Sequence, residues 1–392
     1  MSILVFIVGV ILFTFLVISH EYGHFIMARR GGVEVERFVI YPPAIYKKKT
    51  KAGWLFGIGL LPVGGYVKLK GEHDADTEPG SFGAASTWIK TKIMAAGVAI
   101  NLLTAWLLFT ILALVGMPKI LPHQYTVKAG TQPVSSKVLI TQIDPGSPAA
   151  RAGLKPQDEI EDIGLPGYSP VGITSADQLI ATTPHFAGRT VKIYYSRAGQ
   201  EHVAKATLLS KSAVDASRKT NNPKGYLGIY DPVTYSVERS SLRTAPRVAA
   251  GLSVQLIELS FQGIGHALGG LGSLIAGLVT NNHVARSNGQ AAATNQVGGP
   301  IAIVYLMLHG SLLGYGFMLF IIAYLALILG FMNLLPIPAL DGGRLWIMLA
   351  SRLVKKPLTP KREEAINAVG FMILITLMLL ISLVDFQRFI LH

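Results

Sequence analysis

Long apolar runs without charge constrain this chain more than any other feature of its sequence. Four such runs contain no Asp, Glu, Lys or Arg, and they cover residues 1–19, 93–117, 311–340 and 365–384. A helix needs about 20 such residues to cross the roughly 30 Å of hydrocarbon in a bilayer. Only 15% of the residues are charged, whereas soluble globular proteins carry about a quarter. The sequence therefore predicts a membrane protein.

Basic residues are concentrated in two segments beside the apolar runs, although the whole chain has a net charge of +13. Eleven Lys or Arg lie between Arg29 and Lys92, and six more lie between Arg344 and Arg362. Because basic loops stay on the cytoplasmic side, both segments are expected there. The expected partners of these charges are membrane lipids with anionic headgroups, and no nucleic acid. The absence of cysteine excludes thiolate ligands and a cysteine nucleophile.

The order of apolar and polar segments predicts a polytopic α-helical membrane protein with about four transmembrane helices. The first three helices are expected at 1–28, 93–117 and 301–343, and the fourth with its tail at 365–392. Strand-like runs around a Gly- and Pro-rich centre predict a membrane-associated β-hairpin in the first cytoplasmic loop, 29–92. Short β-branched runs predict a folded extracytoplasmic region at 118–245. An amphipathic or interfacial segment, 246–300, with a loop at 281–296, and a second cytoplasmic loop, 344–364, complete the chain.

The first apolar run ends in the pattern His-Glu-x-x-His, formed by His20, Glu21 and His24. Residues i and i+4 of a helix lie on one face, so both imidazoles can bind one metal ion. Glu21 lies beside them and can take a proton from water as a general base. A five-residue match is common by chance, but three ionisable groups at the end of an apolar span are costly and indicate a function.

A catalytic zinc ion usually has three protein ligands, so a third ligand is expected from another part of the chain. Glu34 and Glu36 follow the motif but lie in the basic loop. Asp341 ends the uncharged run of the third span, on the same predicted side of the membrane as His24. Alone, an aspartate before two glycines would be interpreted as a turn residue. The shared depth makes Asp341 the better candidate.

Two motifs together resemble the site-2 protease family of intramembrane zinc metalloproteases, and in particular its bacterial branch with a PDZ domain. They are the His-Glu-x-x-His pattern and the stretch Asn333-Leu334-Leu335-Pro336-Ile337-Pro338-Ala339-Leu340-Asp341-Gly342-Gly343. The resemblance covers nearly the whole chain. It implies one zinc ion per chain, held by His20, His24 and Asp341, with Glu21 as the catalytic acid and base.

The resemblance also implies a substrate class and a location. The expected reaction is regulated intramembrane proteolysis of single-span transmembrane substrates, such as anti-sigma factors or signal-peptide remnants. The expected place is the bacterial inner (cytoplasmic) membrane, with the active site near the cytoplasmic side and the PDZ domain outside. The residues that the resemblance assigns to substrate binding are Asn333, Pro336, Pro338, Gly64, Gly65, Tyr66 and Asn101. The chain departs from the family at Val98, where proline is frequent in the pattern Gly-Pro-x-x-Asn.

The inserted region has a resemblance of its own. The stretch from Ser147 to Ile160 resembles the PDZ signature S-P-A-x-x-A-G-L-x-x-G-D-x-I, with Gln157 in place of a glycine. Tyr226-Leu227-Gly228-Ile229 resembles the loop whose backbone N–H groups hold a peptide's C-terminal carboxylate. Peptide C-termini are therefore expected partners of one PDZ domain.

Two other functions are open from the residues alone. Intramembrane His and Asp also mark ion paths, so a metal transporter or channel would explain the ligands. A catalytically silent PDZ scaffold would explain the inserted domain. The transporter leaves Glu21 and the PDZ-like domain unexplained, and the scaffold needs no Glu21. The substitution Glu21→Gln should abolish proteolysis but spare metal binding and scaffolding, so it separates the three functions.

Overall fold

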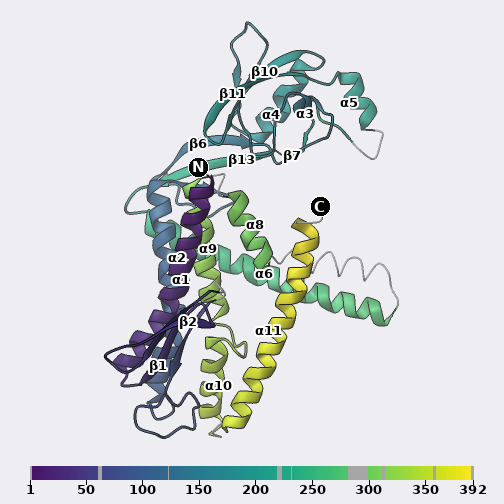
Figure 1. Cartoon of the computed structure of the whole chain (residues 1–392). Helices are drawn as coiled ribbons and strands as arrows, with labels where there is room; N and C mark the ends of the chain where they lie inside the picture. The colour runs from purple at the N-terminus through teal and green to yellow at the C-terminus, as the bar shows by residue number, and fades with distance from the viewer. Residues whose placement is uncertain are drawn as a thin grey trace. The chain divides into compact units, whose positions relative to one another are not determined.

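The computed structural model describes residues 2–60, 64–121, 123–218, 223–230, 232–280, 299–310, 314–355 and 359–389. The chain divides into two compact units, whose elements are labelled in Figure 1. One unit consists of Met1–Val5, Thr110–Val248 and His309–Phe320, and the other of Phe6–Phe109, Ala249–Leu308 and Ile321–His392. The loop predicted at 281–296 lies outside the described residues.

Long helices dominate the described chain. They are α1 Ser2–Arg30, α2 Thr87–Val115, α6 Ala245–Val279, α8 Pro300–Gly310, α9 Tyr315–Met332, α10 Asp341–Leu353 and α11 Pro360–Phe389. Five segments among the described residues are long and apolar enough to cross a membrane: Ile3–Arg30, Thr87–Val115, Ala245–Ala267, Tyr315–Met332 and Pro360–Leu383. The predicted count of four is therefore not confirmed. The additional candidate lies in the segment predicted to be amphipathic, and its mean hydropathy is 1.2, whereas the others reach 2.3 to 2.8.

The third predicted helix, 301–343, corresponds to three helices among the described residues, namely α8, α9 and the start of α10. Helix α9 ends at Met332, a turn follows, and α10 begins at Asp341. Pro336 and Pro338 lie in this turn, where their missing N–H groups and fixed φ angles prevent a continuous helix. The interruption brings the start of α10 to the end of an apolar helix.

The segment 29–92, which was predicted to be a cytoplasmic loop with a β-hairpin, contains a four-stranded sheet. Its strands are β1 Val35–Ile40, β2 Ala44–Lys49, β3 Leu55–Gly59 and β4 Gly65–Leu69, in the order β2-β3-β1-β4. Strands β1 and β3 are parallel, and the other pairs are antiparallel. Strand β4 lies at one edge of this sheet, and among the described strands it pairs with β1 alone.

Aromatic side chains hold the small sheet against α1, beside which Figure 1 shows β1 and β2. The Phe25 ring of α1 lies 5.6 Å from the ring of Phe38 and 5.0 Å from that of Trp54, both in edge-to-face arrangements. The Tyr41 hydroxyl donates a hydrogen bond of 2.5 Å to Thr14 Oγ1. The two aromatic ring pairs each add about 0.5–1.5 kcal/mol to stability, beyond the contribution of the area that they bury. These contacts fix the sheet beside the helix that carries His20 and His24.

The inserted region contains a β-rich fold. A seven-stranded sheet has the order β11-β10-β8-β6-β13-β5 with β9 paired to β8, and β12 pairs with β7 separately. The strands are β5 Met117–Lys119, β6 Thr131–Leu139, β7 Gln142–Ile143, β8 Glu159–Gly164, β9 Val171–Gly172, β10 Thr190–Arg197, β11 Gln200–Thr207, β12 Ile229–Tyr230 and β13 Val233–Ser240. Short helices lie between them: α3 Pro148–Arg151, α4 Ala176–Thr182, η1 Thr183–Phe186 and α5 Lys211–Ser217. Val138, Ile160, Ile163, Val191 and Ile193 are fully buried in its core.

Candidate metal centre

Three potential ligand atoms from α1 and α10 converge at one point. The Nε2 atoms of His20 and His24 are 3.3 Å apart, and Asp341 Oδ2 lies 3.2 Å from the first and 3.1 Å from the second. Nitrogen or oxygen ligands at about 2.0–2.1 Å from a tetrahedral zinc ion are themselves separated by about 3.3–3.4 Å. The triangle that the three atoms form therefore fits one zinc ion. Among the described residues, this is the one group of three His, Cys, Asp or Glu close enough to share a metal.

The carboxyl group of Asp341 is prepared to act as an anionic ligand. It lies outside the candidate membrane spans. Burial alone would raise the pKa of this carboxyl, but hydrogen bonds from His20 and His24 hold the pKa below its usual range. A metal ligand must be deprotonated, and an aspartate with a lowered pKa meets that requirement.

Helix α2 orients His24 through its backbone. The Nδ1 atom of His24 lies 2.8 Å from the carbonyl oxygen of Ile93. Because a carbonyl oxygen can only accept, Nδ1 must carry the proton and donate it. Nε2, which lies 3.1 Å from Asp341 Oδ2, donates its own proton to that carboxylate when the ring is protonated, and offers its lone pair to a metal ion when the ring is neutral. Metal-binding histidines commonly use their second nitrogen in this way.

Asn101 of α2 takes the corresponding place beside His20. Its side-chain amide nitrogen lies 3.2 Å from His20 Nδ1, and its Oδ1 atom is buried without a hydrogen-bond partner. The amide can present either atom to the ring. When it presents the oxygen, it accepts the Nδ1 proton and leaves the Nε2 lone pair for a metal. Asn101 is 1% exposed, so it lies behind the histidine and does not line open space.

Two glycines allow α1 and α2 to approach closely at this point. A Cβ atom on Gly23 would lie 2.8 Å from Ile100 Cδ1 and 3.0 Å from Ala96 O. A Cβ atom on Gly97 would lie 2.4 Å from His24 Nε2 and 2.5 Å from His20 Cε1. Small residues at helix contacts in membranes permit such approach of the two backbones. Gly97 therefore leaves the space in which the two imidazoles sit.

The turn before Asp341 is packed around another glycine pair. The Gly342 N–H donates to the carbonyl oxygen of Asn333 at 2.7 Å. A Cβ atom would lie 2.5 Å from Leu335 O at Gly342 and 2.0 Å from Ile337 O at Gly343. Side chains are thus excluded at both positions, and the first residue of α10 is held in place by the turn.

The edge strand β4 lies beside Glu21. A Cβ atom on Gly65 would lie 3.0 Å from Glu21 Cγ. The backbone N–H of Val67 donates to the Glu21 carboxylate. Tyr66, between them, is 38% exposed. The strand edge and the candidate general base are therefore immediate neighbours.

The structure brings only some of the sequence-predicted residues together. His20, Glu21, His24 and Asp341 meet, with Gly65 beside Glu21, and the turn that contains Asn333, Pro336 and Pro338 leads directly into Asp341. The rejected alternatives Glu34 and Glu36 form ion pairs with Lys70 and Lys68. The predicted loop Tyr226-Leu227-Gly228-Ile229 belongs to the other unit. There it borders a cavity of about 540 Å³ together with α4 and α5 residues.

Sequence reasoning missed two backbone groups of the site. Ile93 contacts the candidate ligand His24 and Val67 contacts the candidate general base Glu21, and both act through backbone atoms, which leave no signal in residue identity. Gly97 is visible in the sequence only as part of the motif that ends at Asn101, and its contact with the histidines requires the helix packing.

Comparison with known proteins identifies the family of this metal centre. The sequence model described as peptidase family M50 matches residues 8–377. The chain belongs to peptidase family M50. This is the site-2 protease family, and the protease is therefore a zinc metalloprotease and an integral membrane protein.

Several bacterial relatives align with the M50 protease over nearly their full length. A Clostridium perfringens protein named as a zinc metalloprotease is 28% identical over 379 residues, which cover 95% of this chain and 96% of the relative. A Campylobacter jejuni protein with the same description is 27% identical, and the alignment covers 98% of this chain and 94% of the relative. An Enterococcus faecalis protein named as a protease is 24% identical, and the alignment covers 97% of this chain and 98% of the relative.

Proposed function

We propose that this metalloprotease cleaves single-span transmembrane proteins within the membrane, with His20, His24 and Asp341 as its zinc ligands and Glu21 as its general acid and base. The observation that carries the proposal is the ligand triangle of 3.1–3.3 Å edges at the end of a candidate span. Glu21 adjoins two of the ligands on the same helix.

The protein groups divide the reaction between them. Zinc, when bound, supplies Lewis acidity that polarises a carbonyl group and acidifies water. Glu21 takes the proton from water and delivers it to the nitrogen of the leaving peptide. Ile93 and Asn101 keep the two imidazoles in the orientation that binding requires.

Strand β4 and the turn after α9 are proposed to hold the substrate. A transmembrane helix hides its carbonyl groups in its own hydrogen bonds, and these bonds must open before hydrolysis. An unwound substrate segment can pair with the edge of β4 along Gly64, Gly65 and Tyr66, as in β-augmentation. The Asn333 amide can hold a substrate carbonyl, and the turn with Pro336 and Pro338 leaves room for an extended chain. Charge substitution of Gly65 or Tyr66 should slow cleavage but retain zinc.

The β-rich unit is proposed to be a PDZ domain that filters substrates by size or binds peptide C-termini. The cavity beside Tyr226, Leu227, Gly228 and Ile229 supports this proposal, because apolar residues such as Leu179 and Val214 also border it. A peptide C-terminus would place its carboxylate on the loop and its last side chain in the cavity.

The proposed location is the bacterial cytoplasmic membrane. The bacterial relatives and the basic segments 29–92 and 344–362 support this location, since such segments stay in the cytoplasm. The metal centre would then lie near the cytoplasmic side and the PDZ domain outside. Anti-sigma factors or signal-peptide remnants are the proposed substrates, and membrane lipids surround the spans.

The test compares the wild type with Glu21→Gln in detergent. Zinc content and cleavage of a single-span substrate are measured for both proteins. Equal zinc content, with cleavage by the wild type alone, is the expected result. Cleavage by Glu21→Gln would remove Glu21 from its role. If both proteins bind zinc and transport it across vesicles without cleaving any substrate, the metal transporter replaces the protease.

A further inference from the structure

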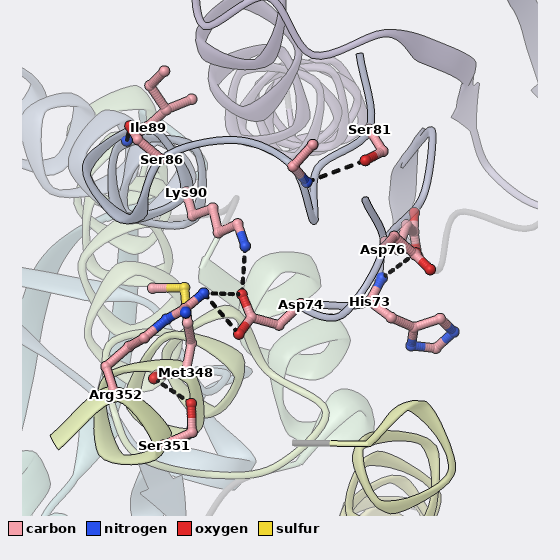
Figure 2. Close-up of polar contacts among 12 residues, drawn as sticks. His73, Asp74, Asp76, Ser81, Ser86, Ile89, Lys90, Met348, Ser351 and Arg352 are labelled. Carbon is pink, nitrogen blue, oxygen red and sulfur yellow. Dashed lines mark hydrogen bonds and ion pairs between the residues drawn. The ribbon is translucent and has the colours of Figure 1, made fainter. Parts of the chain in front are cut away.

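Asp74 joins two helices of the metal centre through one carboxylate. It lies in the loop between β4 and α2, and Figure 2 shows its side chain between two basic residues. Lys90 Nζ, in the first turn of α2, forms an ion pair with Asp74 Oδ1. The Nη2 atom of Arg352, near the end of α10, lies 3.0 Å from each of the two carboxylate oxygens. We name Lys90, Asp74 and Arg352 the Asp74 cluster.

Burial marks the Asp74 cluster as part of the packed structure. The Lys90 side chain is 0% exposed and that of Asp74 is 11% exposed. Lysine is almost never fully buried without a partner, because its charge loses its hydration. Lys90 Nζ also lies 5.6 Å from the centre of the Phe82 ring. The single carboxylate of Asp74 therefore neutralises a buried ammonium group and holds Arg352 at the same time.

The loop that carries Asp74 is attached to α10 at a second point. Arg344 Nη2 donates to the backbone carbonyl oxygen of Glu72 at 3.0 Å. The loop also reaches α11, since the Asp74 N–H donates to Glu363 Oε2 at 3.3 Å. Side chains of α2, α10 and α11 thus all bind residues 72–74.

On both α2 and α10, one anchor to this loop lies about one helical turn from the metal centre, and Arg352 lies farther along α10, eleven residues or about 16.5 Å after Asp341. Lys90 lies three residues before Ile93, and the carbonyl group of Ile93 orients His24. Arg344 follows Asp341 by three residues. Three residues of an α-helix correspond to about 4.5 Å along its axis. A rigid helix transmits a displacement over that distance.

An apolar core fills the space between the anchors and the metal centre. Its buried members are Ala28, Val33, Leu69, Phe82, Ile93, Met94, Leu345 and Met348. They come from the end of α1 and the connection that follows it, from β4, from the loop before α2, and from α2 and α10. Because packed interiors transmit strain, the spacing of α2 and α10 at the Asp74 cluster sets their spacing at the ligands.

We propose that Asp74 and Arg352 are positioning residues for the metal centre. They hold α10 against α2, so that Asp341 Oδ2 stays within reach of both imidazoles. The inference rests on the proposed assignment of His20, His24 and Asp341 as ligands. It adds an ion cluster at the loop end of α2 that tunes zinc affinity without touching the metal.

The decisive variants change Arg352, because its side chain is 49% exposed and its loss leaves the Asp74–Lys90 pair intact. Zinc affinity of the full-length protein is measured by chelator competition, and unfolding of the zinc-free protein is followed separately. Arg352→Gln should lower zinc affinity roughly twofold to thirtyfold. Arg352→Lys, which keeps a charge beside Asp74, should retain more of it. The cobalt-loaded protein should show an altered visible spectrum in Arg352→Gln.

A matched control is available in the other unit. Lys119 forms an ion pair of 3.0 Å with Glu238, and its side chain is 38% exposed. Lys119→Gln should leave both zinc affinity and the cobalt spectrum unchanged. If Arg352→Gln destabilises the zinc-free protein but binds zinc as tightly as the wild type, the cluster serves stability alone and the inference is overturned.

One further variant, Asp341→Ala, distinguishes failure of the inference from failure of the ligand assignment. Asp341→Ala should lose far more zinc affinity than Arg352→Gln. If Asp341→Ala keeps full affinity, the assignment itself is wrong. If only Asp341→Ala loses zinc, the assignment stands and the inference fails. Adding Arg352→Gln to Asp74→Asn should cost little more than Asp74→Asn alone, because both act through one contact. If the losses of zinc affinity in the two single variants add fully in the double variant, the two residues do not act through one contact. Should Asp74→Asn not fold, the Arg352 variants decide.

Discussion

Gly97 offers the sharpest test of how helix packing shapes the metal centre. In Gly97→Ala, the new Cβ atom would lie 2.4 Å from His24 Nε2, which is about 1 Å closer than the ordinary contact of at least 3.4 Å. Metal–ligand distances tolerate changes of only about 0.2 Å. The zinc-free protein can turn its imidazoles away from the methyl group, whereas the zinc-bound protein cannot. The strain therefore reduces zinc affinity.

The size of the loss follows from the cost of overpacking. One inserted methyl group in a packed interior costs about 1–3 kcal/mol, which corresponds to a loss of zinc affinity of roughly fivefold to 150-fold. Chelator competition on the purified protein measures this loss, and cleavage of a single-span substrate at saturating zinc measures its effect on activity. Activity should fall even when zinc is saturating, because the ligands bind in a displaced geometry.

A matched glycine serves as the control for Gly97→Ala. Gly265 lies in α6, and a Cβ atom there would meet nothing within 4 Å. Gly265→Ala should bind zinc as the wild type does, which separates the steric effect from the general effect of alanine on a helix. Equal zinc affinity of Gly97→Ala and the wild type would refute the close approach of α2 to the histidines.

Three more substitutions probe the remaining sides of the site. Asn101→Leu removes the partner of His20 Nδ1 and should lower zinc affinity about 10–100-fold in chelator competition; an unchanged affinity would show that Asn101 does not orient the ring. Gly343→Ala places a Cβ atom 2.0 Å from Ile337 O and should reduce zinc content by displacing Asp341; full zinc content would contradict the packing of the turn. Tyr66→Asp should slow substrate cleavage at unchanged zinc content; equal cleavage rates would argue against pairing with β4.

The sequence identifies the chemical groups of the site but not the neighbouring groups that orient them. The spacing of His20 and His24 is a property of any helix, so it is readable without a structure. Asp341 is readable through its motif and its predicted depth. The carbonyl of Ile93 has no such signature, because every residue has a carbonyl group. Only the packing of α2 against α1 selects the one that His24 meets.

The fold departs from the sequence prediction where long-range pairing decides. The predicted hairpin is a four-stranded sheet, because β1 and β3, which β2 separates along the chain, are neighbours in the sheet and pair in parallel. Period-two patterning does not reveal this pairing. The interruption between α9 and α10 follows from Pro336 and Pro338, because proline lacks the N–H group and the free φ angle that a regular helix requires. The segment from Ala245 has intermediate hydropathy, so composition alone does not separate an interfacial helix from a span.

The distance along the chain between the ligands has a consequence for biosynthesis. His24 and Asp341 are 317 residues apart. At about 5–20 residues per second, a ribosome needs roughly 15–60 s to make the intervening chain. On the proposed ligand assignment, the nascent protein has two of its three ligands during that time and should not hold zinc firmly. Proteolytic activity is then expected only after α10 has been synthesised, so truncated chains that lack α10 should not cleave neighbouring membrane proteins.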